Sequence, residues 1–416
     1  MTGGRVVLTG FGVVSPLGHS LTTLWSGLCG ARFPGAPLRE TSSCRPPLIC
    51  EVAEFDPLDY LHMESALTMS RAGHLVTAAG LMAVRDAQGA NWAPSRMGIA
   101  LGQVWPAYGL VSGRSSVGGW GWGRDLATDL AHVLMATGPT SVCAQGSAAG
   151  LSALAQAVDW IRTGQVEVAV AGGVDVPWLS GILPDFEASG WVVRTEESPA
   201  EWVGPFDPRS PGMVLGEAAA CVVLETEERA RARGASWYAE WEGYTGGVIL
   251  PPASVESDEG HLAMATTVRR CRQLQPEMNQ RIDHLWLTGI GLPEMDQREC
   301  LAISTIWSEE AKGKPCVTSL GGHVGHVFGA TGPLQVIAAC AALAEGPLPV
   351  VRNARRSIPL WGDESVVQEP QTGVSRAMIL TTGIGGLLGV AVVARGAGTK
   401  RVCDADWPED AGVSTR

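Results

Sequence analysis

The sequence predicts an α/β protein built from two similar halves, and two observations favour this fold class. Residues 138–173 give, in order, an apolar strand, a sharp turn, a helix and a second apolar strand, the unit from which α/β sheets are built. A short pattern, apolar residues followed by Thr-Gly-x-Gly, occurs at residues 6–12, 284–291 and 378–386. Short repeats of this kind indicate a duplicated architecture.

The central unit is organised around residues 138–151. Its first residues are small and apolar, as in a buried strand, and Gly146 permits a tight turn. Gly164 ends the following helix, and residues 166–173 form the next apolar strand. The apolar residues of the helix repeat at helical spacing from Ser147 onward: Ala148, Leu151, Leu154, Ala155, Val158 and Ile161.

Ser147 stands at the turn and has two interpretations. Serine is a common N-cap, because its oxygen accepts a hydrogen bond from a free N–H of the first helical turn. Alternatively, a serine at a strand–helix corner lies in the field of the helix dipole, which favours the negative charge that develops on a nucleophile. The stretch alone leaves both interpretations open.

The remaining elements follow from the same patterns. We expect a strand from residue 5 that ends in a Gly/Pro turn by residue 18, and further strands at 98–102 and 221–225. Helices are expected at 66–87 and 226–233, and a Pro-rich irregular segment at about 31–60. Gly246-Gly247 and Pro251-Pro252 mark the boundary, so the halves are 1–245 and 246–398, followed by a polar tail, 399–416, that we expect to be frayed.

Composition excludes several classes of protein. Hydrophobic residues make up 45% of the 416 residues and charged residues 17%, enough for a large core. The net charge of −12 argues against a nucleic-acid partner. No continuous apolar run has the length of a membrane span, and the N-terminus enters a strand directly instead of forming a signal peptide. Ten cysteines without a C-x-x-C pair indicate reduced thiols. We therefore expect a cytoplasmic protein.

A glycine-rich stretch, residues 321–332, carries two histidines three positions apart, His323 and His326. No carboxylate or cysteine stands at ligand spacing, so a metal is not expected; each histidine taken alone is as well explained as part of the core or of a loop. The glycines at 383–386 are not followed by a helix and an acidic residue at dinucleotide-binding spacing, so no cofactor is expected either.

Several motifs in the same order make the chain resemble the β-ketoacyl synthase family, which has the thiolase fold. The resemblance covers nearly the whole chain and implies two pseudo-repeated α/β halves in helix–sheet–helix–sheet–helix layers. The motifs are the N-terminal strand with its Gly/Pro turn, the Gly138-Pro139 corner, Ala171-Gly172-Gly173-Val174-Asp175, Pro205-Phe206-Asp207, Gly216-Glu217, Gly325-His326, Gly329-Ala330-Thr331-Gly332 and Gly383-Ile384-Gly385-Gly386.

The departures from the family pattern concern its functional residues. Ser147 occupies the position of the nucleophilic cysteine, and Thr288 that of the first catalytic histidine. Gly321 replaces the family's lysine and Ile384 its gating phenylalanine, whereas the second catalytic histidine is kept as His326. Losing one donor that stabilises developing charge costs on the order of 10²–10³ in rate. The combined losses therefore predict negligible condensation.

Within the family, this pattern is similar to the chain length factor, the β subunit of a bacterial type II polyketide synthase. The resemblance implies a heterodimer with an active ketosynthase α subunit, and an acidic acyl carrier protein that docks mainly on that partner. The role implied here is to complete the interface and to shape the polyketide tunnel and the product length. We expect residues about 103–135, which include Trp105, Trp120 and Trp122, to form this region.

Two alternatives stay open. Ser147 with His326 as base could accept an acyl group, which would make the chain an acyltransferase or starter-loading subunit. The chain could also be a degenerate homodimeric synthase with a structural role. A close Ser147–His326 pair would favour the first alternative, and purification without a partner would favour the second.

Overall fold

The computed structural model describes residues 4–39, 46–89, 92–105, 125–179, 181–194, 202–249, 259–274, 280–308, 313–345, 348–349, 351, 374–396 and 398–400. Within them, two five-stranded units share one strand order and one set of pairing directions. The first three strands of each unit are parallel and the last two are antiparallel to their neighbours. The first unit is β5 (Thr140–Cys143), β4 (Met97–Gly102), β6 (Val168–Asp175), β8 (Ala218–Thr226) and β1 (Val6–Val14), and the second is β11 (Cys316–Ser319), β10 (His284–Leu287), β12 (Arg376–Thr382), β13 (Leu387–Ala394) and β9 (Ala239–Val248).

The two units join where β1 pairs antiparallel with β9, giving one ten-stranded sheet. The predicted duplication is therefore confirmed, but the strands that correspond between the two units differ from those predicted. By strand order β10 corresponds to β4, not to β1, and the second unit starts with β9 at Ala239. Gly246 and Gly247, expected at the boundary, lie inside β9.

The repeated Thr-Gly-x-Gly pattern predicted the wrong correspondence between strands, because its glycines have different structural roles. In β1, a Cβ at Gly12 would lie 1.8 Å from the carbonyl oxygen of Ala79, so this glycine admits a helix against the strand. At Gly289, after β10, φ is +56°, a turn conformation that glycine favours. The same letters therefore do not mark the same structural position.

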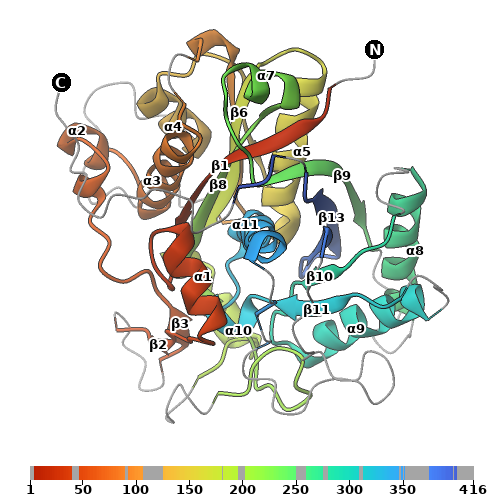
Figure 1. The fold of residues 1–416 in the computed structure, drawn as a ribbon. Helices are drawn as coiled ribbons and strands as arrows, with labels where there is room; N and C mark the ends of the chain where they lie inside the picture. Colours follow the sequence, from red (N-terminus) through yellow and green to blue (C-terminus); the bar gives the residue numbers. More distant parts are fainter. Residues whose placement is uncertain are drawn as a thin grey trace.

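The helices form three layers around the two units (Figure 1). The helices α3 (Arg71–Asp86) and α4 (Leu126–Leu134) cover the outer face of the first unit. The helices α8 (Glu259–Leu274) and α9 (Pro293–Trp307) cover that of the second. Between the units lie α5 (Ala149–Arg162) and α11 (Thr331–Glu345), with α1 (Leu21–Cys29) beside them. This is the predicted helix–sheet–helix–sheet–helix order.

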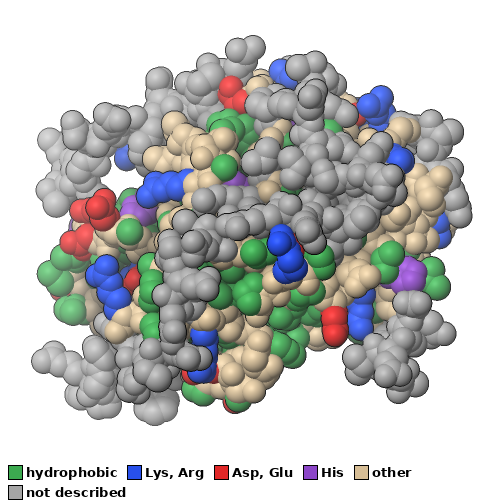
Figure 2. Space-filling view, turned by 90° about the horizontal axis from the view of Figure 1, so that it is seen from below, with side chains coloured by type: hydrophobic (Ala, Val, Ile, Leu, Met, Phe, Trp, Pro, Cys, Tyr) green, Lys and Arg blue, Asp and Glu red, His purple; other side chains and the backbone are tan. Residues whose placement is uncertain are grey.

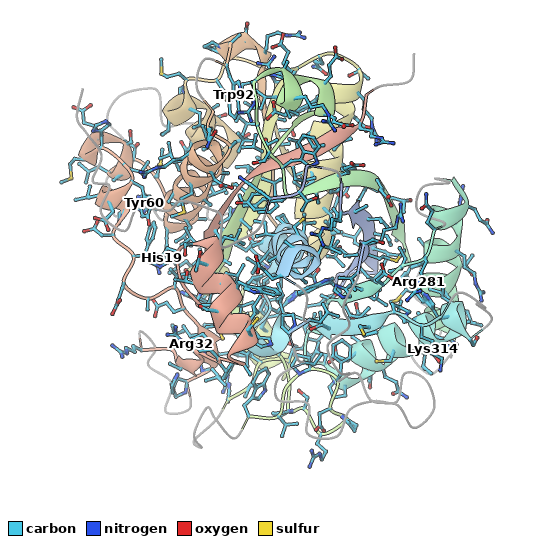
Figure 3. The ribbon with its side chains drawn as sticks, in the orientation of Figure 1. His19, Arg32, Tyr60, Trp92, Arg281 and Lys314 are labelled. Atoms are coloured by element: carbon cyan, nitrogen blue, oxygen red, sulfur yellow. The ribbon has the colours of Figure 1, made fainter. Side chains whose placement is uncertain are left out.

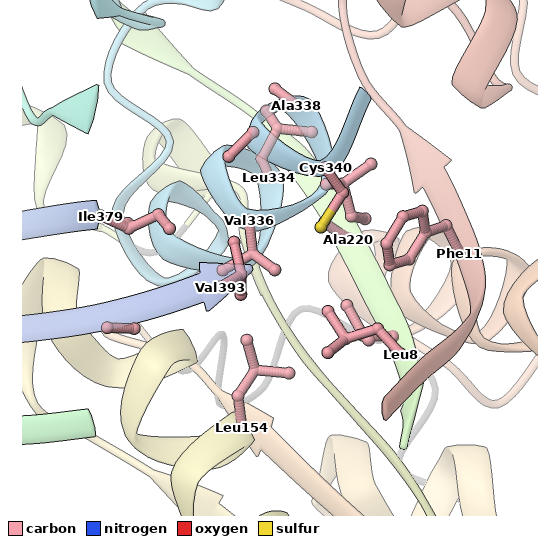
Figure 4. Packing of buried hydrophobic residues seen from close by; sticks show 14 of the residues in the cluster. Leu8, Phe11, Leu154, Ala220, Leu334, Val336, Ala338, Cys340, Ile379 and Val393 are labelled. Carbon is pink, nitrogen blue, oxygen red and sulfur yellow. The ribbon is translucent and has the colours of Figure 1, made fainter. Parts of the chain in front are cut away.

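The middle layer holds the largest core. Leu334, Val336 and Cys340 of α11 belong to one cluster with Leu154 of α5 and Phe11 of β1 (Figure 4). Residues 328–345 are apolar enough and long enough to cross a membrane, but 89% of this segment is buried inside the protein. A helix that is apolar on all sides and enclosed between the two units of the sheet is a core helix.

Several boundaries differ from the predicted ones. The helix expected at 66–87 begins only at Arg71, as α3, because Ser70 caps it by accepting a hydrogen bond from Gly73 N at 3.2 Å. Ala66 instead ends a separate short helix, α2 (Met63–Ala66). The helix expected at 226–233 is α7 (Glu227–Ala232), capped by Thr226. The described part of the Pro-rich segment contributes β2 (Ala36–Pro37) and β3 (Leu48–Cys50), which form a small sheet with β7 (Leu215–Gly216).

The start of the polar tail is anchored instead of frayed. Lys400 Nζ donates to Asp86 Oδ1 at 3.1 Å and to Thr9 O at 3.2 Å, and Lys400 N donates to Trp237 O at 2.8 Å. The prediction for 399–416 is therefore wrong for its first residues, and 401–416 lie outside the described part.

Candidate active site

Ser147 lies in a short 3₁₀ turn, η3 (Gly146–Ala148), between β5 and α5. Gly146 supplies the left-handed backbone of the turn, with φ +54°. The N-cap of α5 is Ala148, and no side chain caps the helix. Instead, Ser147 Oγ lies 3.0 Å from His326 Nε2, and the serine is only 2% exposed. The capping interpretation of Ser147 is therefore wrong, because its hydroxyl is directed at the histidine.

His326 is held from the other side by β7. It follows the short helix α10 (Gly321–Val324) and the turn at Gly325, where φ is +70°. His326 N donates to Val214 O at 2.7 Å, and Gly216 N donates to His326 O at 2.9 Å. Burial lowers the pKa of His326 to about 3. The imidazole is therefore neutral near pH 7, and with its proton on Nδ1 its Nε2 accepts a hydrogen bond from the Ser147 hydroxyl.

Thr288, at the position of the family's first histidine, is committed to β12. Its Oγ1 accepts a hydrogen bond from Thr382 N at 2.7 Å and lies 3.3 Å from Leu380 O. Thr288 N and Gly289 N donate to the carboxyl oxygens of Glu299 at 3.2 and 3.0 Å. The residue at this position thus fixes the end of β10 against β12.

Gly321, at the position of the family's lysine, has no room for a side chain. A Cβ there would lie 1.9 Å from Gly289 O and 3.0 Å from Pro205 Cγ. Gly289 in turn lies against Phe206, since its own Cβ would be 2.5 Å from the Phe206 ring. The segment that carries Thr288 is therefore packed directly onto α10.

Two carboxyl groups of α9 hold this segment in place. Asp296 accepts hydrogen bonds from Phe206 N at 3.0 Å and Ile290 N at 2.9 Å. Burial raises the pKa of Asp296 to about 8, and burial also raises the pKa of Glu299. No role was predicted for either acid from the sequence. The feature that could have indicated a role is their i, i+3 spacing in the first turns of the helix that begins at Pro293, which puts both on one face.

Asp175 is a further buried acid that the sequence analysis left without a role. At the end of β6, its Oδ1 accepts from Trp105 N at 2.9 Å, and its Oδ2 accepts from Val104 N at 3.0 Å and Gly329 N at 2.8 Å. Burial raises the pKa of Asp175 to about 7. This carboxyl joins the segment after β4 to the turn after His326.

The turn at residues 383–386 completes the site. A Cβ on Gly383 would lie 3.2 Å from Ser147 N, so this turn lies against the serine. Ile384 packs against the hydrophobic cluster that contains Phe328, whose ring contacts His326. The structure thus brings Ser147, His326 and the 383–386 turn together. Thr288 and Gly321 form a neighbouring cluster.

The described residues include part of the predicted interface and tunnel region. Of the interface and tunnel region expected at 103–135, Trp105 stands edge-on to the ring of Phe328, which contacts His326, whereas α4 lies in the outer helix layer. Residues 106–124, with Trp120 and Trp122, lie outside the described part. Within the described ranges, no group of three or more His, Cys, Asp or Glu side chains could hold a metal.

Comparison with known proteins gives consistent matches. The signatures of the β-ketoacyl synthase N-terminal and C-terminal domains match residues 4–230 and 253–355. A polyketide β-ketoacyl synthase of Streptomyces halstedii is 30% identical over 94% of this chain and 97% of its own. The ketoacyl synthase α subunit of the Streptomyces glaucescens tetracenomycin polyketide synthase is 29% identical, with the same coverage. The solved ishigamide ketosynthase/chain length factor has a TM-score of 0.80 and 25% identity, over 95% of this chain and 100% of its own.

Proposed function

Since the chain belongs to the β-ketoacyl synthase family, we propose that it is a chain length factor, the condensation-inactive β subunit of a type II polyketide synthase. In this role it pairs with an active ketosynthase in the cytoplasm and shapes the polyketide tunnel and the product length. The similarity to the ishigamide ketosynthase/chain length factor supports this assignment.

The contact between Gly321 and Gly289 carries the proposal. A condensing member of the family has a lysine at the position of Gly321 and its first catalytic histidine at the position of Thr288, and this chain has neither group there. The space of a side chain at 321 is taken by Gly289 O at 1.9 Å, and the Thr288 hydroxyl is bonded to β12. The difference from condensing family members therefore includes the position of the main chain at Gly289, as well as the side chains at 288 and 321. Decarboxylative condensation loses the donors that would stabilise its developing enolate.

An exposed sheet edge supports the proposal that this chain pairs with a partner chain. β5 forms one end of the ten-stranded sheet, and its four residues are exposed or half-buried, whereas β11 at the other end is buried. Met135, at the end of α4 beside β5, is 72% exposed. The open N–H and C=O groups of an edge strand are a template for pairing with another chain. Because β5 leads into the Ser147 turn, a partner at this edge would lie next to the site.

The surface charge supports the proposal that an acyl carrier protein docks mainly on the partner chain. The chain carries a net charge of −12. On the face seen from below, the described Lys and Arg side chains are scattered among apolar and uncharged residues and a few acidic ones (Figure 2). An acidic carrier protein would gain little attraction from such a surface.

The proposal is tested by assaying condensation with three preparations: this chain alone, its ketosynthase partner alone, and the two combined. We expect the two chains to co-purify as a heterodimer and full-length product to form only when both are present. Condensation by this chain alone would refute the proposal. Isolation of this chain as a homodimer that the ketosynthase does not need would favour the degenerate synthase instead.

A second candidate function is supported by the 3.0 Å contact between Ser147 and His326. Ser147 Oγ would attack the carbonyl carbon of a thioester, its proton would pass to His326 Nε2, and the thiol would leave with that proton. The product is an acyl-serine. Mass spectrometry of the chain after incubation with an acyl-carrier thioester tests this function, with Ser147→Ala as control. An adduct that Ser147→Ala abolishes would establish acyl transfer.

A further inference from the structure

A continuous series of aromatic rings leads from the protein surface to His326. Trp191 follows α6 (Leu183–Ala188), is 37% exposed, and lies 6.3 Å from Phe186 between ring centroids. Phe186 stacks on Phe328 at 5.8 Å with 16° between the planes. The Phe328 ring lies 4.3 Å from the imidazole of His326. Trp105 stands edge-on to Phe186 and Phe328, at 5.8 and 5.9 Å.

We refer to Trp105, Phe186 and Phe328 as the aromatic column. Phe186 and Phe328 are 4% and 2% exposed, so these rings fill the space between Trp191 and the Ser147–His326 pair. Side chains packed at this density leave no passage for another group unless a ring moves. The serine and the histidine are therefore covered from this direction by apolar rings.

The main chain holds the column in place. Phe328 has φ +43°, a conformation that bulky residues rarely adopt and that persists only where the surroundings enforce it. Asp175 supplies part of this constraint, because its carboxyl accepts hydrogen bonds from both Trp105 N and Gly329 N, at 2.9 and 2.8 Å. One buried side chain thus fixes the backbone of two segments that carry rings of the column.

We propose that the aromatic column closes the Ser147–His326 pair to acyl donors in the isolated chain, and that the pair becomes reactive when Phe186 or Phe328 is removed. The inference rests on the proposed function, in which condensation is left to the partner and this chain needs no open route to its own serine. In this proposal the Ser147 hydroxyl and His326 Nε2, which lie 3.0 Å apart, are already within hydrogen-bond distance, and the closed column limits their reaction.

The test labels the full-length chain, without any partner, with a small dialkyl fluorophosphonate. In the reaction, Ser147 Oγ bonds to phosphorus and fluoride leaves, while the serine proton passes to His326. Phe186→Ala removes the ring contacts with Phe328 and Trp105, and one aromatic pair is worth up to about a tenfold change in an equilibrium. We expect Phe186→Ala to be labelled at least about tenfold faster than the unaltered chain, as measured by intact mass and peptide mapping.

Two further variants separate access from other effects. Phe328→Gly removes the ring and also relieves the positive φ, so it opens the column without depending on Phe186. Phe55→Ala is the matched control, because Phe55 stacks on Tyr60 at 5.7 Å in a different cluster. Figure 3 places Tyr60 on the outer flank of the molecule beside α3. Labelling of Phe186→Ala must disappear when Ser147→Ala is added.

A second probe reports access without requiring a nucleophilic serine. Diethyl pyrocarbonate acylates a neutral imidazole, so its reaction with His326 should also accelerate in Phe186→Ala and Phe328→Gly. The proposal is overturned if the unaltered chain reacts as fast as these variants with either probe. It is equally overturned if both variants, folded by circular dichroism, react no faster than Phe55→Ala. Neither result would alter the condensation assay of the heterodimer, because no partner takes part here.

Discussion

Gly321→Ala tests whether the backbone has closed over the position of the family's lysine. The added Cβ would lie 1.9 Å from Gly289 O, whereas real Cβ contacts are essentially never shorter than 3.0 Å. The Gly289 segment must therefore move by about 1 Å or more, which takes Gly289 N out of hydrogen-bond range of Glu299, now at 3.0 Å. Overpacking and the lost hydrogen bond together should lower the free energy of unfolding by about 3 kcal/mol or more.

The assay is equilibrium denaturation in guanidinium chloride, followed by circular dichroism. Gly385→Ala is the matched control, since Gly385 lies in the neighbouring turn and nothing lies within 4 Å of its added Cβ. The control should change the free energy of unfolding by no more than about 0.5 kcal/mol. If Gly321→Ala unfolds at the same denaturant concentration as Gly385→Ala, the closed backbone around Gly321 is refuted.

Three further outcomes follow from the structure. Burial lowers the pKa of His284 to about 4, and neither ring nitrogen has a hydrogen-bond partner within the described residues. The unfolded chain then binds more protons between pH 6.5 and 4, so stability is lost as pH falls through this window, and His284→Leu should lose less Tm between pH 7 and pH 5 than the unaltered chain. Arg71→Ala leaves the buried Glu217 carboxyl without its guanidinium partner and should lower the free energy of unfolding, measured by denaturation, by about 3 kcal/mol or more. Arg96→Ala removes one side of an exposed ion pair and should lower it by less than about 1 kcal/mol. Ser147→Cys should yield no condensation in a product assay of the isolated chain, because the family's lysine and first histidine are still missing; product formation would contradict this.

The layered fold and the Ser147–His326 pair could be predicted from the sequence. Apolar strands and helices of ordinary length alternate clearly around Gly146, and the Gly-rich turn at His326 marks a close approach of backbone. The family resemblance placed both residues at one site, and the structure puts them 3.0 Å apart although they are 179 positions apart in the chain.

The remaining features depend on contacts that no local pattern encodes. A glycine at 321 shows that a lysine is missing, but not that Gly289 O occupies its space. Asp175 has the appearance of an acid at a strand end, and only the folded chain brings three N–H groups to its carboxyl. The conformation of Phe328 is likewise imposed by tertiary packing. Local propensity predicts elements, whereas these constraints arise from how the elements meet.

The most direct test of the account is the product made by the reconstituted heterodimer when this subunit carries Ser147→Ala. If the chain shapes the tunnel and leaves chemistry to its partner, the yield and the chain length of the product will not change. Loss of product from an intact heterodimer would contradict the account and would assign Ser147 a place in the chemistry.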